Sequence, residues 1–201
     1  MGFFLNDFYF DYDSPGDSVE QVLEKILSLA ESPVVKPHAL LREAVEKAPE
    51  KLLVELLKHP NREVRQFAVK ALWQIWYFEK GEEAREELMM GNRALANRRL
   101  GDALKLFETV HKRYPDWAEP INKAATVYFL LKRPACSIDL CKIVLELKPH
   151  HFGAWNGLVQ CALMVNDLEL ASDALKHYWK LCPHAEDALE LDHVIRERES
   201  D

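Results

Sequence analysis

The sequence predicts an all-α fold in which helical repeats stack into a solenoid, and three observations support this prediction. Pro115, Pro149 and Pro183 lie 34 residues apart, and a fixed period of this length is typical of helical repeat arrays. Each proline follows an apolar stretch with helical periodicity. Small and large side chains also recur at fixed positions in the same frame. With each proline at position 32, the repeat units are 84–117, 118–151 and 152–185.

Residues 1–34 are predicted to form an acidic, aromatic arm followed by a first helix. Large apolar side chains in residues 1–17 are interleaved with Asp7, Asp11 and Asp13, and the sequence DSPGDS then predicts a turn. Ser18 and Gln21 have the spacing of a capping box at the start of a helix. The arm either packs on its own domain, since exposed aromatic residues favour aggregation, or offers anchors to another protein.

Residues 35–83 are predicted to be a second helical region. Pro37 and Pro49 stand at the starts of two short helices, and Asn61 is placed to cap a longer one with the sequence REVRQFAVKALWQIWYFEK. The run LLKHPNREVRQFAVKAL resembles one helix pair of a HEAT-type repeat. Helical spacing predicts an inward-facing stripe in the longer helix, made of Val64, Phe67, Ala68, Ala71, Leu72 and Ile75.

Within the three units, side-chain size alternates in the way that two crossing helices require. Position 8 holds Gly91, Ala125 and Val159, and position 24 holds Phe107, Cys141 and Leu175. Small residues are needed where helices cross closely, and large ones fill the space between repeats. Together with the prolines, this pattern resembles the tetratricopeptide repeat (TPR) family over about half of the chain. The resemblance implies a right-handed α–α superhelix, although Val159 is bulky for position 8.

Residues 186–201 continue the helical pattern and are predicted to form a C-terminal capping helix. A terminal repeat needs such a polar cover for its exposed apolar face. Leu189 and Val194 are expected to dock on the last repeat while the charged residues face water.

Composition excludes several classes of function. The net charge of −7 is unsuited to a duplex nucleic-acid surface, and no stretch is long and apolar enough for a membrane span. No Gly-rich phosphate loop is present. The four cysteines form no CxxC pair, so we expect buried thiols in an intracellular, reducing compartment, either the cytoplasm or an organelle stroma or matrix. Because the N-terminus matches neither a secretory signal nor an Arg-rich transit peptide, no targeting peptide is expected in this chain.

Catalysis and metal binding have little support in the sequence. Cys182 and His184 form a conceivable nucleophile pair, but nothing around them predicts the electropositive pocket that activates a thiol. His150 and His151 lack a metal-binding frame and are expected to shape the turn between repeats. We therefore predict a non-enzymatic protein with no catalytic residues, cofactor or metal.

The resemblance to TPR proteins implies that the first helix of each unit lines a concave groove. A line of side-chain amides there can donate to and accept from the backbone of an extended peptide. The sequence therefore favours an adaptor or assembly factor that binds a partner protein in this groove. The predicted groove residues are Arg85, Asn92, Asn122, Lys123, Thr126, Phe129, Asn156, Gln160 and Met164.

Three other functions are compatible with a helical-repeat fold. One is a structural subunit bound through the convex face and the N-terminal arm. RNA binding of the pentatricopeptide kind is disfavoured by the 34-residue period and the acidic composition. Some TPR proteins clamp the terminal carboxylates of heat-shock chaperones with Lys and Arg. Here Asn92 fits that clamp, but Leu88, Gly153 and Gly157 stand where the cations belong, so a chaperone clamp is not expected.

Overall fold

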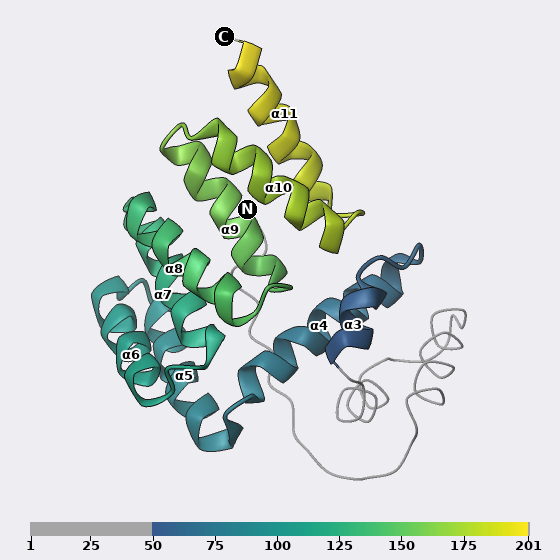
Figure 1. Cartoon of the computed structure of the whole chain (residues 1–201). Helices are drawn as coiled ribbons and strands as arrows, with labels where there is room; N and C mark the ends of the chain where they lie inside the picture. Colours follow the sequence, from purple (N-terminus) through teal and green to yellow (C-terminus); the bar gives the residue numbers. More distant parts are fainter. Residues whose placement is uncertain (1–49, 201) are drawn as a thin grey trace. The chain divides into compact units, whose positions relative to one another are not determined.

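The structure is a computed structural model that describes residues 50–200. The predictions for the N-terminal arm, for the first helix with its capping box and for the helix after Pro37 lie outside these residues. Every regular element in the described part is an α-helix (Figure 1), which confirms the all-α helical-repeat fold. The chain divides into two compact units, Met1–Trp76 and Tyr77–Asp201.

The first unit contains α3 (Glu50–Leu56) and most of α4 (Arg62–Phe78). The predicted cap of α4 is confirmed, because the side-chain oxygen of Asn61 accepts a hydrogen bond from the backbone N–H of Glu63 at 2.8 Å. Of the predicted inward stripe, Phe67 and Ile75 are only half-buried, whereas Val64, Ala68, Ala71 and Leu72 are buried. The indole N–H of Trp76 donates to Glu50 within this unit. The HEAT-type character of the pair stays a prediction.

The second unit consists of three antiparallel helix pairs followed by a single helix (Figure 1). The first pair is α5 (Gly81–Ala96) and α6 (Leu100–Arg113), the second α7 (Ala118–Leu130) and α8 (Pro134–Leu147), and the third α9 (Phe152–Met164) and α10 (Leu168–Leu181). The last helix is α11 (Glu186–Ser200). Each proline of the 34-residue period follows the end of a pair, since proline cannot continue a helix.

The first helices of the pairs form an inner layer. Along the array, α5 contacts α7, α7 contacts α9, and α9 contacts α11, while each second helix packs between two first helices. This arrangement gives the second unit an inner face, which we define as the surface of α5, α7 and α9. The outer face is the surface of α6, α8 and α10.

The turn inside each helix pair has the same backbone conformation. Arg98, Lys132 and Asn166, which are 34 residues apart, have φ values of 57°, 58° and 58°. Such left-handed residues end helices in the Schellman arrangement, in which the following N–H bonds back to a carbonyl near the helix end. These bonds join Arg99 to Ala94, Arg133 to Tyr128 and Asp167 to Ala162, each at 2.9 Å. None of the three turn residues is glycine, so each turn carries the steric cost of a Cβ in this conformation.

Packing between the helices of the first pair depends on a missing side chain. A Cβ added at Gly91 would lie 2.3 Å from Cε1 of Phe107, whose side chain is fully buried. Positions 8 and 24 of the repeat therefore face each other, and here the smallest residue is opposite the largest. Phe107 belongs to a buried cluster with Leu88, Trp117 and Val127, among others.

The capping helix α11 docks through a different stripe than expected. Leu189 is 64% exposed, so the prediction that it docks was wrong. The buried residues are Ala188 and Ile195, seven positions apart on one side of the helix. Leu189 follows Ala188 directly and is turned by about 100° from it, which carries its side chain out of the interface.

Candidate binding face

All the predicted groove residues lie on the helices of the inner layer. Arg85 and Asn92 belong to α5, Asn156, Gln160 and Met164 to α9, and the others to α7. Met164 is 39% exposed at the end of α9. Phe129 is half-buried, with the Lys132 ammonium 5.7 Å from its ring centre. The positions that the repeat frame assigns to the groove therefore share a layer, but their side chains differ widely in exposure.

The amides at the centre of the predicted row are buried. Asn122 is 6% exposed, and Asn156 is 9% exposed. Thr126 is also buried, and its hydroxyl donates to the backbone carbonyl of Asn122 at 3.0 Å, within the same helix. Helix-to-helix packing along the inner layer thus covers side chains that a single repeat unit would leave in water.

The amides of the third repeat unit, 152–185, form hydrogen bonds with the capping helix α11. The Asn156 side-chain N–H donates to Asp187 at 2.5 Å, and the Tyr178 hydroxyl donates to the two carboxylate oxygens of Asp187 at 3.0 and 3.1 Å. Gln160 donates in turn to Asn156. Burial, and then the neighbouring Asp187 charge, raise the pKa of Tyr178, so its hydroxyl stays a donor. This network fixes α11 on α9 and α10.

The inner face of the first two repeat units, 84–117 and 118–151, contacts residues from the end of α4. The Arg85 guanidinium lies 4.6 Å from the ring centre of Phe78, and the Lys123 ammonium 5.2 Å from that of Tyr77. Both separations suit cation–π attraction. The Tyr77 hydroxyl is 3.5 Å from the Asn92 amide nitrogen, at the limit of a hydrogen bond.

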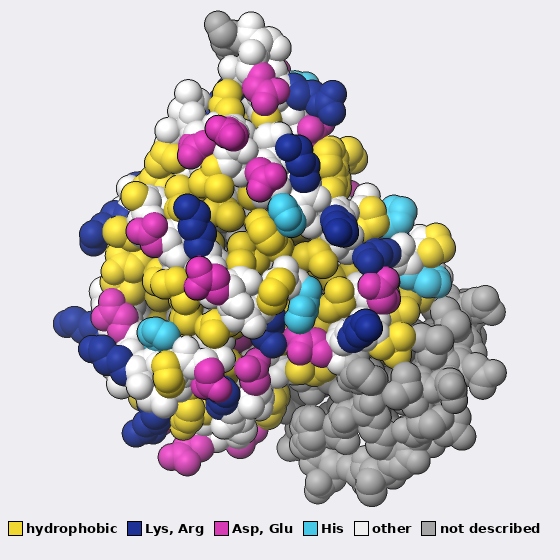
Figure 2. Space-filling view, viewed as in Figure 1, with side chains coloured by type: hydrophobic (Ala, Val, Ile, Leu, Met, Phe, Trp, Pro, Cys, Tyr) yellow, Lys and Arg dark blue, Asp and Glu magenta, His cyan; other side chains and the backbone are white. Residues whose placement is uncertain are grey.

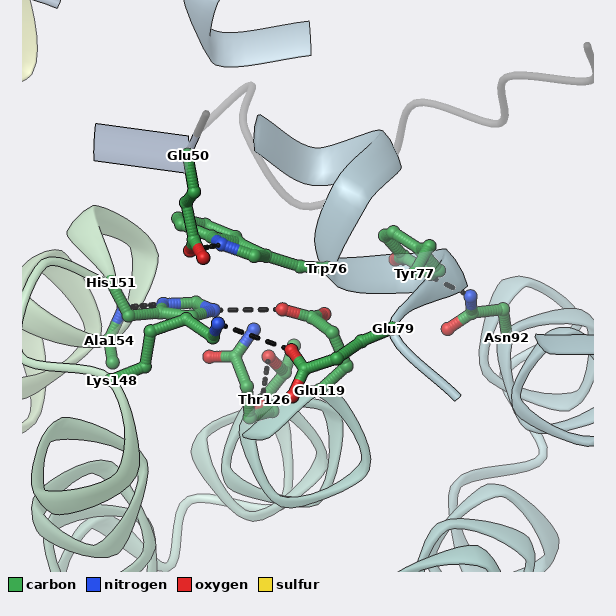
Figure 3. A network of polar contacts seen from close by, with 11 residues as sticks. Glu50, Trp76, Tyr77, Glu79, Asn92, Glu119, Thr126, Lys148, His151 and Ala154 are labelled. Atoms are coloured by element: carbon green, nitrogen blue, oxygen red, sulfur yellow. Dashed lines mark hydrogen bonds and ion pairs between the residues drawn. The ribbon is translucent and has the colours of Figure 1, made fainter. Parts of the chain in front are cut away.

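A carboxylate completes this set of contacts. The Lys148 ammonium pairs with Glu79 at 3.1 Å, and the Lys148 side chain is only 11% exposed. Figure 3 shows Asn92 directed at Tyr77 and Lys148 beside Glu79. We call Tyr77, Phe78 and Glu79 the 77–79 segment. Sequence reasoning missed Lys148 because the repeat frame assigns it to the turn before Pro149 rather than to a first helix.

A buried carboxylate–imidazole pair joins α7 to the N-terminus of α9. Glu119 and His151 are both fully buried, with Nε2 of His151 2.8 Å from Oε1 of Glu119. Nδ1 of His151 accepts the backbone N–H of Ala154 at 3.0 Å, so the ring proton is on Nε2 and is donated to Glu119 (Figure 3). The other carboxylate oxygen, Oε2, is buried without a hydrogen-bond partner. His151 therefore caps α9, which confirms that it shapes the turn between repeats.

The thiols have the properties of buried structural residues. Burial, and then the nearby Asp187 charge, raise the pKa of Cys182 to about 12, so this group is a neutral thiol at neutral pH. Burial also raises the pKa of Cys141 to about 12. A thiol in this state is a poor nucleophile. Among residues 50–200 there is no cluster of three His, Cys, Asp or Glu side chains that could hold a metal ion.

Together these features define a protein class: a helical-repeat solenoid whose inner face carries charged and aromatic side chains. No helix in the described part of the chain is long and apolar enough to cross a membrane. No family profile and no curated protein matches the sequence. Solved structures do match the fold.

The matching structures are TPR domains. The first TPR domain of Spaghetti (RPAP3), solved with the HSP90 peptide SRMEEVD, matches with a TM-score of 0.57 at 18% identity, covering 59% of this chain and 94% of that one. The first TPR domain of human RPAP3 gives 0.54 at 17% identity, over 59% and 96% of the two chains. The Sgt2 TPR domain of Aspergillus fumigatus gives 0.52 at 16%, over 59% and 78%. The chain therefore contains the TPR fold, as its repeat pattern indicated.

Proposed function

We propose that this chain is a non-enzymatic protein-interaction module, an adaptor or assembly factor that holds a segment of a partner protein on its inner face. The observation that carries the proposal is the convergence of three cations, two on the inner face and one in the turn after α8, on the 77–79 segment. Arg85 from α5, Lys123 from α7 and Lys148 from the turn after α8 each contact one residue of the 77–79 segment. A surface that holds aromatic rings and a carboxylate in this way has the chemistry of a peptide-binding site.

The partner is not expected to be the carboxylate end of a heat-shock chaperone. One structural neighbour was solved with an acidic HSP90 peptide, but Leu88 occupies a place where the chaperone clamp requires a cation. Leu88 is fully buried in the core, so no rotation presents another group there. Titrating the peptide SRMEEVD onto this chain tests the point, and saturable binding at micromolar concentration contradicts it.

A native pull-down with mass spectrometry tests the inner-face proposal. Lys123→Glu reverses one cation of the inner face, and Lys142→Glu makes the same change at an exposed position of α8 on the outer face. Both variants are checked for native helicity by circular dichroism. We expect the wild type and the Lys142→Glu variant to capture the same partner protein, and the Lys123→Glu variant to lose it. Equal capture by all three proteins rejects the inner face as the binding site.

A second candidate function is a structural subunit bound through the outer face and the N-terminal arm. Two apolar residues one turn apart on α8 favour it, since Ile143 is 40% exposed and Leu147 is 42% exposed. Figure 2 shows apolar side chains over the region where Figure 1 places α8, α9 and α10, and those of α8 and α10 belong to the outer face. A partner lost with Ile143→Glu and retained with Lys123→Glu supports this alternative.

The cysteines bear on the compartment. All four are free, and three of them are buried in the repeat units. We propose that the protein works inside the cell in a reducing environment, where free thiols persist.

A further inference from the structure

We propose that the inner face of the first two repeat units is selective for two adjacent aromatic residues followed by a carboxylate, supplied by a partner protein. In the chain alone, the 77–79 segment takes the same contacts and must leave before the partner binds. This inference rests on the proposed function and specifies the chemistry of the partner.

The selectivity follows from the order of the cations. Arg85, Lys123 and Lys148 come from separate elements, and each meets a different residue of the segment. Two of the cations face aromatic rings, and the third faces a carboxylate. The Arg85 and Lys148 side chains are each only 11% exposed. Arg85 also pairs with Glu82 at 2.7 Å, but both cations are poorly hydrated, so an apolar or basic segment is a poor replacement for this one.

The 77–79 segment has the features of an exchangeable occupant. Tyr77 packs against the buried cluster around Phe107 but, like Phe78, is only half-buried, and the Glu79 side chain is 27% exposed. The segment ends two residues before Gly81, whose φ of +84° is one that side-chain-bearing residues rarely adopt. A Cβ at Gly81 would meet nothing within 4 Å. Because glycine reaches backbone conformations that are closed to other residues, we take Gly81 as the point at which the end of α4 turns away from α5 and withdraws the segment.

The same order of residue types occurs a second time in the sequence. Tyr9, Phe10 and Asp11 repeat the order aromatic, aromatic, carboxylate of the 77–79 segment. A peptide of the arm is therefore a second probe for the inner face, and it tests whether this chain itself supplies the ligand.

The test is a titration of a fluorescent peptide of residues 74–82 against the full chain. Three proteins are compared: wild type, Tyr77→Ser/Phe78→Ser, and the latter with Lys123→Glu. We expect the double variant to bind at least about tenfold more tightly than wild type, because the competing segment lowers the fraction of binding-competent molecules. Adding Lys123→Glu is expected to abolish the gain. Equal binding of a scrambled peptide to the double variant overturns the inference.

A second variant covers the case in which the double variant does not fold. Glu79→Gln keeps both rings and removes only the charge opposite Lys148, so the chain's own segment is held less tightly. We expect a severalfold gain in affinity for the 74–82 peptide, and no gain overturns the inference. Tighter binding of a peptide of residues 6–14 than of residues 74–82 also overturns it, because the occupant is then the arm of this chain and not a partner protein.

The two proposals fail in distinguishable ways. If Lys123→Glu still abolishes capture of a cellular partner but the 74–82 peptide does not bind, only the inferred aromatic–acidic chemistry is wrong. If the peptide binds as expected but capture of the partner is insensitive to Lys123→Glu, the inner face has the inferred selectivity and the proposed function is wrong.

Discussion

Replacing Gly91 with alanine tests the close packing of α5 on α6. Alanine normally stabilises a helix interior by about 1 kcal/mol relative to glycine. At this position the new Cβ would lie 2.3, 2.7 and 2.9 Å from three atoms of the Phe107 ring. Contacts this short force either the ring or the helix to move.

The cost of that movement exceeds the helix gain. The Phe107 side chain is fully buried, and overpacking a well-filled core costs about 1–3 kcal/mol, more where the neighbours cannot yield. We expect Gly91→Ala to lower the free energy of unfolding by about 1–2 kcal/mol. In a unit of this size, that loss corresponds to a fall in Tm of roughly 3–8 °C.

Urea denaturation followed by far-UV circular dichroism measures the effect, with two glycine controls in the same unit. A Cβ at Gly101 meets nothing within 4 Å, and a Cβ at Gly157 meets only Cys141 Sγ at 3.4 Å. We expect both alanine variants to be as stable as wild type or up to about 1 kcal/mol more stable. The reasoning is refuted if Gly91→Ala matches these controls. A double variant with Phe107→Leu should show favourable coupling between the two sites.

Three further predictions follow from other features. Lys132→Gly removes the steric strain of a Cβ in the left-handed conformation and should raise the free energy of unfolding by about 1 kcal/mol. Lys142→Gly within α8 should lower it by about 1 kcal/mol. Urea denaturation of both variants measures the two effects. Burial raises the pKa of Cys182 to about 12, so a thiolate-specific reagent at pH 8 should label the half-buried Cys136 before Cys182. The free energy of unfolding should also fall from about pH 9 to 12, because the Cys182 thiol ionises in the unfolded chain over this range but stays neutral in the folded one. His151→Ala removes a helix cap and leaves a buried carboxylate without its donor, so chemical denaturation should show a loss of about 3 kcal/mol or more. A loss below about 1 kcal/mol means that water replaces the imidazole.

Sequence reasoning predicted the elements that depend on short-range chemistry. The Asn61 cap and the turns after Pro115, Pro149 and Pro183 follow from local hydrogen bonding and from the geometry of proline. The small residue at Gly91 was also predicted as a crossing point. Its pairing with Phe107 was not, because a repeat period states which positions are equivalent but not which of them touch.

The candidate site was less predictable for the same reason. The repeat frame assigns Asn122 and Asn156 to the first helices, but their burial depends on how far one repeat rotates against the next. No period in the sequence encodes that rotation. The contact of Glu79 with Lys148 joins residues far apart in the chain. Only the folded array brings them together, so neither residue carries a local signal of the contact.

The buried Glu119–His151 pair has a mechanical consequence. It connects the first helix of the second repeat, α7, to the N-cap of α9. The equivalent positions hold Arg85 and Trp117 in the first repeat and Gly153 and Ala185 in the third, and these residues cannot form such a pair. In a solenoid, each repeat is held by its neighbours. Stretched between its ends in an optical trap, the array should therefore lengthen unevenly, and residues 118–181 should rupture together in one larger step.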